Sequence, residues 1–278
     1  MAAPPELIDI GVNLAHRSFG SDRLDVIRRA QQAGVRVLIA TGTSVAGSRE
    51  ALELAQHGAH RGVVFATAGV HPHDSGRCDD AAFRQLRELA QRSEVVAVGE
   101  CGLDFNRDFS PRPVQQRIFA AQIELAIELG KPLFLHERDA HPTLLEILDR
   151  YRDKARGTLP VPAVVHCFTG QPQALHDYLD RGFYIGITGW ICDERRGREL
   201  QGLVSQIPLE RLMVETDAPF LMPRDLRPKL AAGRNEPCTL PHITSTIARC
   251  MQRPFVEVAA HTTDNARRFF RLDARTAV

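Results

Sequence analysis

The chain has 278 residues, 44% of them hydrophobic and 25% charged, which is the composition of an ordinary globular protein with a full core. Its formal net charge of +1, from 35 basic and 34 acidic residues, argues against a protein that coats duplex DNA with a broad basic face. No apolar run approaches the roughly 18 residues that a membrane span needs. The first residues, MAAPPE, lack the basic and apolar regions of a signal peptide, so we expect a cytoplasmic protein. The six cysteines form no CxxC pair and are read as reduced thiols.

Apolar runs of strand length alternate with amphipathic helical stretches along the chain. The predicted strands are Leu7–Val12, Val35–Ala40, Val63–Ala68, Val95–Val98, Leu133–His136, Ala163–His166, Phe183–Thr188 and Leu212–Asp217. The helices expected between them are Asp22–Ala33, Gly47–His57, Asp79–Gln91, Val114–Leu129, Pro142–Arg152, Pro172–Arg181 and Arg195–Gln206. Continuous apolar runs are typical of parallel strands covered on both faces. Eight such units predict an α/β protein with a closed (β/α)8 barrel.

The structural rival is an open, doubly wound sheet. Such a sheet would need a phosphate-binding fingerprint at its first turn, and neither GxGxxG nor GxxxxGK[ST] occurs there. The Pro-rich segment Ala218–Pro241 is too long for an ordinary connection, and we expect an ordered loop over the barrel mouth. The tail, His242–Gln252 and Val256–Phe270, is predicted to form extra helices on the outside. We therefore expect residues 1–278 to form a single domain.

Several strands deliver an ionisable side chain at their carboxyl ends, where barrels of this kind place their active sites. Glu100, His136, His166 and Asp217 follow the fourth, fifth, sixth and eighth strands, and Asp9 and His71 belong to the first and third. Each residue alone is better explained as a cap or a rim residue, but the four together predict a metal site. Imidazole and carboxylate ligands without a thiolate suit Mg²⁺, Mn²⁺ or Zn²⁺.

A metal held there would polarise an ester or phosphoryl oxygen and supply a hydroxide nucleophile. Asp217 is the candidate general base, or the group that orients the attacking water. Glu100 is a candidate bridge between two ions about 3.5–4 Å apart.

Substrate contacts are predicted from residues that follow the last strands. Arg224, Arg227, Lys229 and Arg234 outnumber the acidic residues of the late loop and could bind terminal phosphates. A second basic group, Arg195, Arg196 and Arg198, is explained equally well as a solvated surface. Trp190 could stack an unpaired base or fill the core at the rim.

The chain resembles the TatD family of metal-dependent deoxyribonucleases, which have an amidohydrolase-like barrel. The matching segments are Asp9–Asn13 (DIGVN), Gly69–Asp74 (GVHPHD), Gly99–Asn106 (GECGLDFN), Leu135–His141 (LHERDAH), Val165–Gly170 (VHCFTG), Tyr184–Trp190 (YIGITGW), Val214–Pro219 (VETDAP) and Arg234–Pro237 (RNEP). They cover nearly the whole chain, from Leu7 to about Phe270. The resemblance is closest to bacterial TatD proper.

This resemblance implies a Mg²⁺-dependent 3′→5′ exonuclease that acts on the 3′ ends of single-stranded DNA and RNA and serves DNA repair, with no required protein partner. By position, Glu100, His136, His166 and Asp217 match the metal residues of the family, and Glu100 and Asp217 are also expected to take part in catalysis. His71 matches a histidine that contacts phosphate or assists the chemistry. Together with the residues argued above, the full set of expected substrate contacts is His71, His73, Arg138, Trp190, Arg224 and Arg234.

One motif departs from many relatives, which carry Asp-x-His-x-His on the first strand. Here Gly11 and Asn13 stand in place of the two histidines that hold one of the metals. We therefore expect one firmly bound ion at Glu100, His136 and His166, and a weaker site near Asp217 and Asp9.

Other functions remain open at the level of the sequence. They are a small-molecule amidohydrolase, an esterase that deacylates charged tRNA, and a non-catalytic barrel with a structural metal. The basic loop favours a phosphate-bearing polymer over a neutral amide, and an open ligand set argues against a structural site, which is normally closed.

Overall fold

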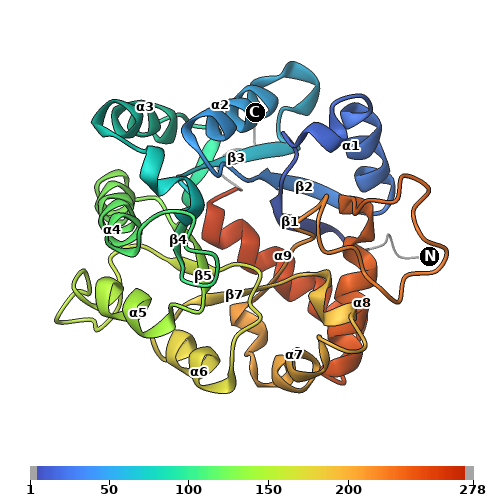
Figure 1. The fold of residues 1–278 in the computed structure, drawn as a ribbon. Helices are drawn as coiled ribbons and strands as arrows, with labels where there is room; N and C mark the ends of the chain where they lie inside the picture. The colour runs from blue at the N-terminus through green and yellow to red at the C-terminus, as the bar shows by residue number, and fades with distance from the viewer. Residues whose placement is uncertain (1–4, 273–278) are drawn as a thin grey trace.

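A computed structural model describes residues 5–272, and it confirms the predicted barrel. Eight parallel strands form one sheet in the order β1 to β8. Figure 1 shows the strands at the centre of the molecule with helices around them. The strands are β1 (Leu7–Val12), β2 (Val35–Ala40), β3 (Val64–Ala68), β4 (Val95–Asp104), β5 (Leu133–Arg138), β6 (Ala163–Val165), β7 (Tyr184–Ile187) and β8 (Leu212–Val214).

Each strand is connected to the next by helical structure. The α-helices are α1 (Arg23–Gln32), α2 (Val45–Gln56), α3 (Asp80–Ala90), α4 (Arg112–Leu129), α5 (His141–Asp149), α6 (Pro172–Asp180), α7 (Arg198–Leu203), α8 (Leu240–Cys250) and α9 (Phe255–Phe270). Short 3-10 helices that the sequence did not predict are η1 (Arg17–Phe19), η2 (Gly58–His60), η3 (Pro72–Arg77), η4 (Gly189–Cys192), η5 (Val204–Gln206), η6 (Leu209–Arg211) and η7 (Pro237–Thr239). None of the helices in residues 5–272 is both long enough and apolar enough to cross a membrane.

The two ends of the sheet meet beyond the end of β8. The amide of Asp217 donates to the carbonyl of Gly11 at 2.8 Å, and the amide of Asn13 donates to Ala218 at 2.8 Å. These bonds join the segment after β8 to β1 and draw Asp217 into the mouth of the barrel.

The barrel interior is a packed apolar core that α9 closes at the amino-terminal ends of the strands. The ring of Phe269 packs edge-on against Tyr184 at 5.3 Å between centroids and against Phe270 at 4.7 Å. The buried side chains of this core are Ile8, Ile10, Val37, Ile39, Phe65, Val96, Ala97, Phe134, Val164, Tyr184, Met213, Ala266, Phe269, Phe270 and Leu272. Because this end is filled, the chemistry is confined to the opposite, carboxyl-terminal face.

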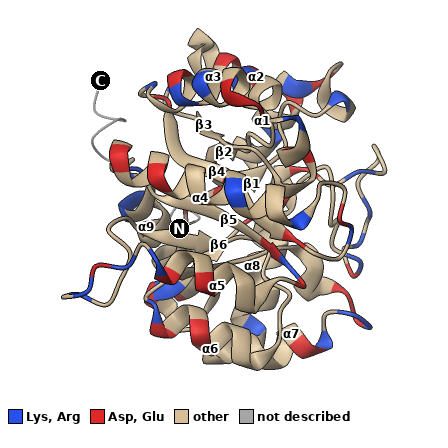
Figure 2. Ribbon diagram, turned by 60° about the vertical axis from the view of Figure 1, so that its left-hand side comes forward, with Lys and Arg blue, Asp and Glu red and all other residues tan. Residues whose placement is uncertain are grey.

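Charged residues of both signs are interspersed along the outer helices and loops (Figure 2). This distribution agrees with the near-zero net charge.

The largest difference from the predicted elements is β4, which continues six residues past Val98 to Asp104. Gly99 and Gly102 have φ values of +140° and +143°, which side chains rarely adopt. A Cβ on Gly102 would lie 1.9 Å from the carbonyl oxygen of His136, so only glycine allows this approach to β5. The register with β5 shifts between Val98 and Cys101, and Glu100 lies within this irregular part of the strand.

Smaller differences lie at the ends of other elements. The predicted strand to Asp217 ends at Val214, and the helix predicted from Arg195 begins at Arg198 as α7. The late loop is ordered, as expected, but it ends in η7 and runs directly into α8 at Leu240.

Candidate active site at the barrel mouth

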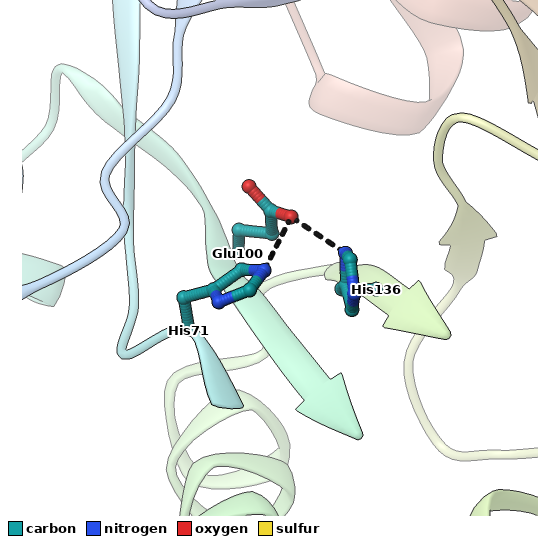
Figure 3. A group of neighbouring side chains, drawn as sticks. All are labelled: His71, Glu100 and His136. Atoms are coloured by element: carbon teal, nitrogen blue, oxygen red, sulfur yellow. Dashed lines mark hydrogen bonds and ion pairs between the residues drawn. The ribbon is translucent and has the colours of Figure 1, made fainter. Parts of the chain in front are cut away.

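Three imidazole nitrogens converge on one oxygen of Glu100. Nε2 of His166 lies 2.8 Å from Oε1 of Glu100, and Nδ1 of His136 lies 3.0 Å from the same atom. His71, which precedes η3, brings its Nε2 within 3.4 Å. Figure 3 shows His71 and His136 pointing at this carboxylate from the two neighbouring strands. Four side chains far apart in the sequence therefore form one cluster.

The charges of the cluster stabilise one another. Burial by itself raises the pKa of Glu100, but His166, His71 and the hydrogen bonds from the imidazoles outweigh it and hold that pKa well below its usual range. Burial lowers the pKa of His166, but Glu100 and Glu215 raise it well above the ordinary value. Burial also lowers the pKa of His71, where Glu100 compensates only in part.

These side chains fit a metal ion. His71, Glu100 and His136 each offer a ligand atom within 4.8 Å of the others, and this group could hold a cation. Nε2 of His136 is buried without a well-aligned hydrogen bond, 3.4 Å from Oδ2 of Asp104. Neutral imidazoles beside carboxylates are the donors of catalytic metal sites.

Asp217 lines the same cleft as this cluster. Burial is the largest of the causes that raise the pKa of Asp217 to about 7. The charges of Glu100 and Glu215 raise this pKa further, whereas the charge of His166 lowers it. Nδ2 of Asn13 donates to Oδ1 of Asp217 at 2.9 Å. The carboxyl group thus changes its protonation near neutral pH, as a general base requires.

Glu215 is a site residue that the sequence analysis missed. It is fully buried, and its Oε1 accepts from the amide of Cys167 at 2.5 Å while its Oε2 lies 3.4 Å from Nδ1 of His166. Glu215 thereby orients the imidazole whose other nitrogen faces Glu100. Its place two residues before Asp217 was the available signal, since alternate residues of an extended segment share a face.

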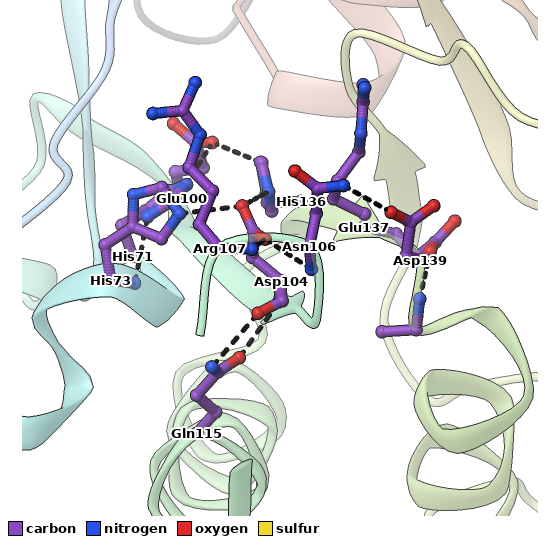
Figure 4. A network of polar contacts seen from close by, with 12 residues as sticks. His71, His73, Glu100, Asp104, Asn106, Arg107, Gln115, His136, Glu137 and Asp139 are labelled. Atoms are coloured by element: carbon purple, nitrogen blue, oxygen red, sulfur yellow. Dashed lines mark hydrogen bonds and ion pairs between the residues drawn. The ribbon is translucent and has the colours of Figure 1, made fainter. Parts of the chain in front are cut away.

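Asp104 is the second residue that was missed. Its Oδ2 lies 2.7 Å from Nε2 of His73, and Gln115 fixes its backbone through bonds of 2.9 Å and 3.1 Å (Figure 4). Burial raises the pKa of Asp104, but hydrogen bonds from His136, His73 and the backbone lower it below its usual range. Had β4 been predicted through Asp104, the alternation of side chains would have placed it on the same face as Glu100.

The cluster forms the floor of a cleft of about 710 Å³. Of the predicted substrate contacts, His71, His73, Arg138 and Trp190 line this cleft. Arg138 lies 3.5 Å from the Thr169 hydroxyl, and the guanidinium of Arg196 lies 4.5 Å above the ring of Trp190. Trp190 is partly buried and packs against the hydrophobic core, and it also lines the cleft. The two roles considered for it, core filling and base stacking, are therefore compatible.

Two predicted phosphate-binding arginines, Arg234 and Arg224, pair with carboxylates and do not line the cleft. Nη2 of Arg234 lies 2.6 Å from both carboxylate oxygens of Asp22 and 3.3 Å from Glu236, so this side chain fastens the late loop to α1. Arg234 is not among the residues that line the cleft. Arg224 is 60% exposed and lies 3.2 Å from Asp193, beside Arg196 at the rim.

Two exposed aromatic rings near the cleft were not predicted. Phe220 is 50% exposed, lines the cleft and meets His16 edge-on at 5.4 Å. Phe109 is 65% exposed and packs edge-on against His73 at 4.7 Å. Large exposed apolar side chains at a polar cleft indicate a ligand with flat apolar faces.

Glu215 explains why the first strand carries a glycine, and not a histidine, at position 11. A Cβ on Gly11 would lie 2.3 Å from Oε2 of Glu215 and 3.1 Å from Phe134, so Glu215 occupies the space of a side chain at position 11. Asp9 is buried, and its oxygens accept from the Thr216 amide at 2.9 Å, the Thr216 hydroxyl at 2.5 Å and the Gly11 amide at 3.3 Å. The weaker ion expected near Asp9 and Asp217 stays a prediction.

Known proteins share both the sequence and the fold. A family model described as "TatD related DNase" matches residues 8–271. A Pectobacterium atrosepticum protein named "3'-5' ssDNA/RNA exonuclease TatD" is 50% identical over 266 residues, which are 96% of this chain and 100% of that protein. A Salmonella typhimurium protein of the same name is 50% identical and covers 95% of this chain and 98% of its own length.

Solved structures agree. A TatD homologue from Escherichia coli k12 superposes with a TM-score of 0.84 at 28% identity and covers 95% of this chain and 98% of its own. A TatD family hydrolase from Entamoeba histolytica has the same fold, with a TM-score of 0.84 at 24% identity over 96% of this chain and 99% of its own. With the family model matched from β1 to the end of α9, the chain belongs to the TatD-related DNase family.

Proposed function

We propose that this protein is a metal-dependent 3′→5′ exonuclease that hydrolyses the phosphodiester bonds of single-stranded DNA and RNA. The observation that carries the proposal is the convergence of His71, His136 and His166 on Glu100, with Asp217 beside them, at the open end of a barrel. Relatives that are about half identical over nearly their full length are named for this activity. A role in DNA repair and a cytoplasmic location stay predictions from the family resemblance.

In this proposal Glu100, His136 and His166 would hold one ion firmly, and Asp217 lines the same cleft. Mg²⁺ is the proposed ion, and Mn²⁺ and Zn²⁺ suit the same nitrogen and oxygen donors. When bound, the ion supplies Lewis-acid polarisation of a phosphoryl oxygen and lowers the pKa of a bound water. Glu215 orients His166, and Asp104 orients His73 and His136.

The side chains have separate tasks in the hydrolysis. Asp217 takes the proton of the attacking water, and Asn13 fixes the direction of its carboxylate through the bond to Oδ1. His71 lies between Glu100 and His73, and the two histidine rings are 4.3 Å apart between centroids. In this proposal His71 donates a hydrogen bond to a phosphate oxygen. A strand that ends in the cleft would place its terminal phosphodiester over these groups.

The proposed substrate contacts lie higher in the cleft. Arg138 and Arg196 line it and offer charge-assisted hydrogen bonds to backbone phosphates. Phe220 presents an exposed ring to an unpaired base, and Trp190 would do so once the Arg196 guanidinium, which lies 4.5 Å above its ring, moves to a backbone phosphate. Such a contact tolerates any base and either sugar. The polar floor and cationic rim favour a polyanion over the neutral amide of a small-molecule amidohydrolase.

The test is the degradation of single-stranded DNA labelled at the 3′ or the 5′ end, with Mg²⁺ and with EDTA. We expect mononucleotides to be released from the 3′ end, and activity to fall about 10²–10³-fold in Glu100→Gln, His136→Gln and Asp217→Asn. His261→Gln, a change of an exposed histidine on α9, is the matched control for His136→Gln. Release that persists in Glu100→Gln or in EDTA would overturn the proposal, and deacylation of charged tRNA without nuclease activity would favour the esterase.

A further inference from the structure

A second group of metal-type side chains lies away from the cluster around Glu100. It forms where the late loop meets η4 and α8, and its members are Cys192, Asp225 and His242. One ligand atom of each residue lies within 4.8 Å of the other two. Cys192 is the last residue of η4, and His242 is the third residue of α8. Asp225 belongs to the loop between β8 and η7.

The three side chains are already held together in the fold. Nε2 of His242 lies 2.7 Å from Oδ1 of Asp225, so the imidazole and the carboxylate face each other. Their side chains are 32% and 24% exposed, whereas Cys192 is 1% exposed beneath them. A cation could therefore enter from solvent and meet the thiol at the inner end of the site.

The donor set selects the kind of ion. A thiolate is a soft ligand that favours zinc over magnesium or calcium, and imidazole and carboxylate complete common zinc sites. With bond lengths of about 2.0–2.3 Å, ligand atoms on a tetrahedral zinc lie about 3–4 Å apart. To reach those separations, the His242 and Asp225 atoms, now 2.7 Å apart, would separate slightly, and no pair of ligand atoms in the group starts more than 4.8 Å apart. The nitrogen and oxygen donors around Glu100 contain no thiolate, so the two groups differ in the ions they prefer.

We propose that Cys192, Asp225 and His242 bind a zinc ion that fastens the late loop to η4 and α8. The Cys192 thiol releases its proton to solvent as it binds, and a water molecule completes the four ligands. The site is separate from the hydrolytic cluster and does not depend on the function proposed for that cluster.

The position of the site gives it a structural consequence at the rim of the cleft. Asp193, the residue after Cys192, pairs with Arg224 at 3.2 Å and with Arg196 at 3.0 Å. Arg224 directly precedes Asp225, and Arg196 covers Trp190. A zinc ion would hold Asp225 and thereby keep the neighbouring arginine beside the rim.

Cobalt substitution tests the ligand assignment. The chelator-treated full chain is titrated with Co²⁺, and the thiolate-to-cobalt charge-transfer absorption in the near ultraviolet is recorded. We expect the band in the wild type and its loss in Cys192→Ser. It should be retained in Cys250→Ser, at the end of α8, and in Cys167→Ser, at the barrel mouth. A wild type without the band, or a band lost only in Cys167→Ser, would overturn the proposal.

Zinc binding and proteolysis give a second, independent readout. Because Cys192 is buried and its substitution could disturb folding, the exposed partners are changed instead, in His242→Gln and Asp225→Asn. Titration calorimetry of the wild type should show a zinc site that is lost or weakened in the variants. In each variant we expect the dissociation constant of that site to rise at least about 10-fold. Zinc should slow tryptic cleavage after Lys229 of the late loop in the wild type and leave the cleavage rate unchanged in His242→Gln. Equal protection of both proteins would refute the proposal that zinc fastens this loop.

Discussion

Oε2 of Glu215 lies 2.3 Å from the point where a Cβ of residue 11 would stand, which makes Gly11 and Glu215 mutually dependent. Both oxygens of this glutamate are engaged, by Cys167 and His166, so it cannot move aside freely. Residue 11 of the first strand is thus a glycine because the buried carboxylate of Glu215, directly after the last strand, fills the space next to it.

Gly11→Ala should lower the free energy of unfolding by about 1–3 kcal/mol, because the new methyl group overpacks Glu215 and Phe134. Urea denaturation measures this change, and Gly58→Ala is the control, since no atom lies within 4 Å of a Cβ there. The cost should shrink when Gly11→Ala is combined with Glu215→Ala. An equal cost in both backgrounds would contradict the dependence.

Asp217→Asn should change the pH dependence of stability in the metal-free protein. The folded-state pKa of Asp217 is raised from 3.8 to about 7, so the stability linked to its protonation is present below pH 3.8 and is lost as the pH rises through 7. The variant does not suffer this loss. Between pH 4 and pH 8 it should gain about 1–2 kcal/mol relative to the wild type, a value reduced because the group faces cleft water. Urea denaturation in EDTA at both pH values measures this, and parallel pH curves would refute it.

Asn13→Ala should shift the acid limb of the pH–activity profile upward. The amide of Asn13 donates to Asp217 and favours its ionised form, so losing that bond raises the pKa of Asp217. We expect the midpoint of kcat/KM to move by about one pH unit. Asn106→Ala is the matched control, because Asn106 also lines the cleft but donates to Asp139. An unchanged midpoint would show that Asn13 does not set the pKa of Asp217.

Phe220→Ala should weaken binding of single strands without slowing the chemical step. Base stacking on an aromatic ring is worth about 1–3 kcal/mol, so KM should rise roughly 5-fold or more at unchanged kcat. Val256→Ala, at a 60% exposed apolar residue of α9, should leave both constants unchanged. Trp190→Ala tests the predicted stacking of the tryptophan in the same assay, and an unaltered KM in both cleft variants would exclude stacking at the rim.

Arg234→Ala should act on the fold and not on the substrate. Its guanidinium is held by Asp22 and Glu236, so its loss should reduce the free energy of unfolding by about 1–3 kcal/mol. KM of the folded variant should match that of the wild type, whereas Arg138→Ala should raise it, because Arg138 lines the cleft. Thermal denaturation measures the effect on stability, and initial rates measure the effect on KM. A rise in KM in Arg234→Ala but not in Arg138→Ala would support the original prediction that Arg234 binds phosphate.

The sequence by itself determined the barrel and the composition of its mouth. Continuous apolar runs separated by helical stretches leave few arrangements other than parallel strands covered by helices. The carboxyl ends of such strands meet at one face, so Glu100, His136 and His166 could be grouped before any coordinate was known. Local pattern was sufficient there, because the period of the strand fixes where its last side chain lies.

Only the tertiary structure decided which polar residues meet and which are used elsewhere. The extension of β4 to Asp104 depends on a close approach to β5 that glycine permits. Arg234 pairs with Asp22, and Glu215 fills the space beside Gly11, across more than 200 residues of sequence in both cases. Such partners are selected by distance and free volume in the folded chain, and neither quantity is encoded in the local periodicity of either segment.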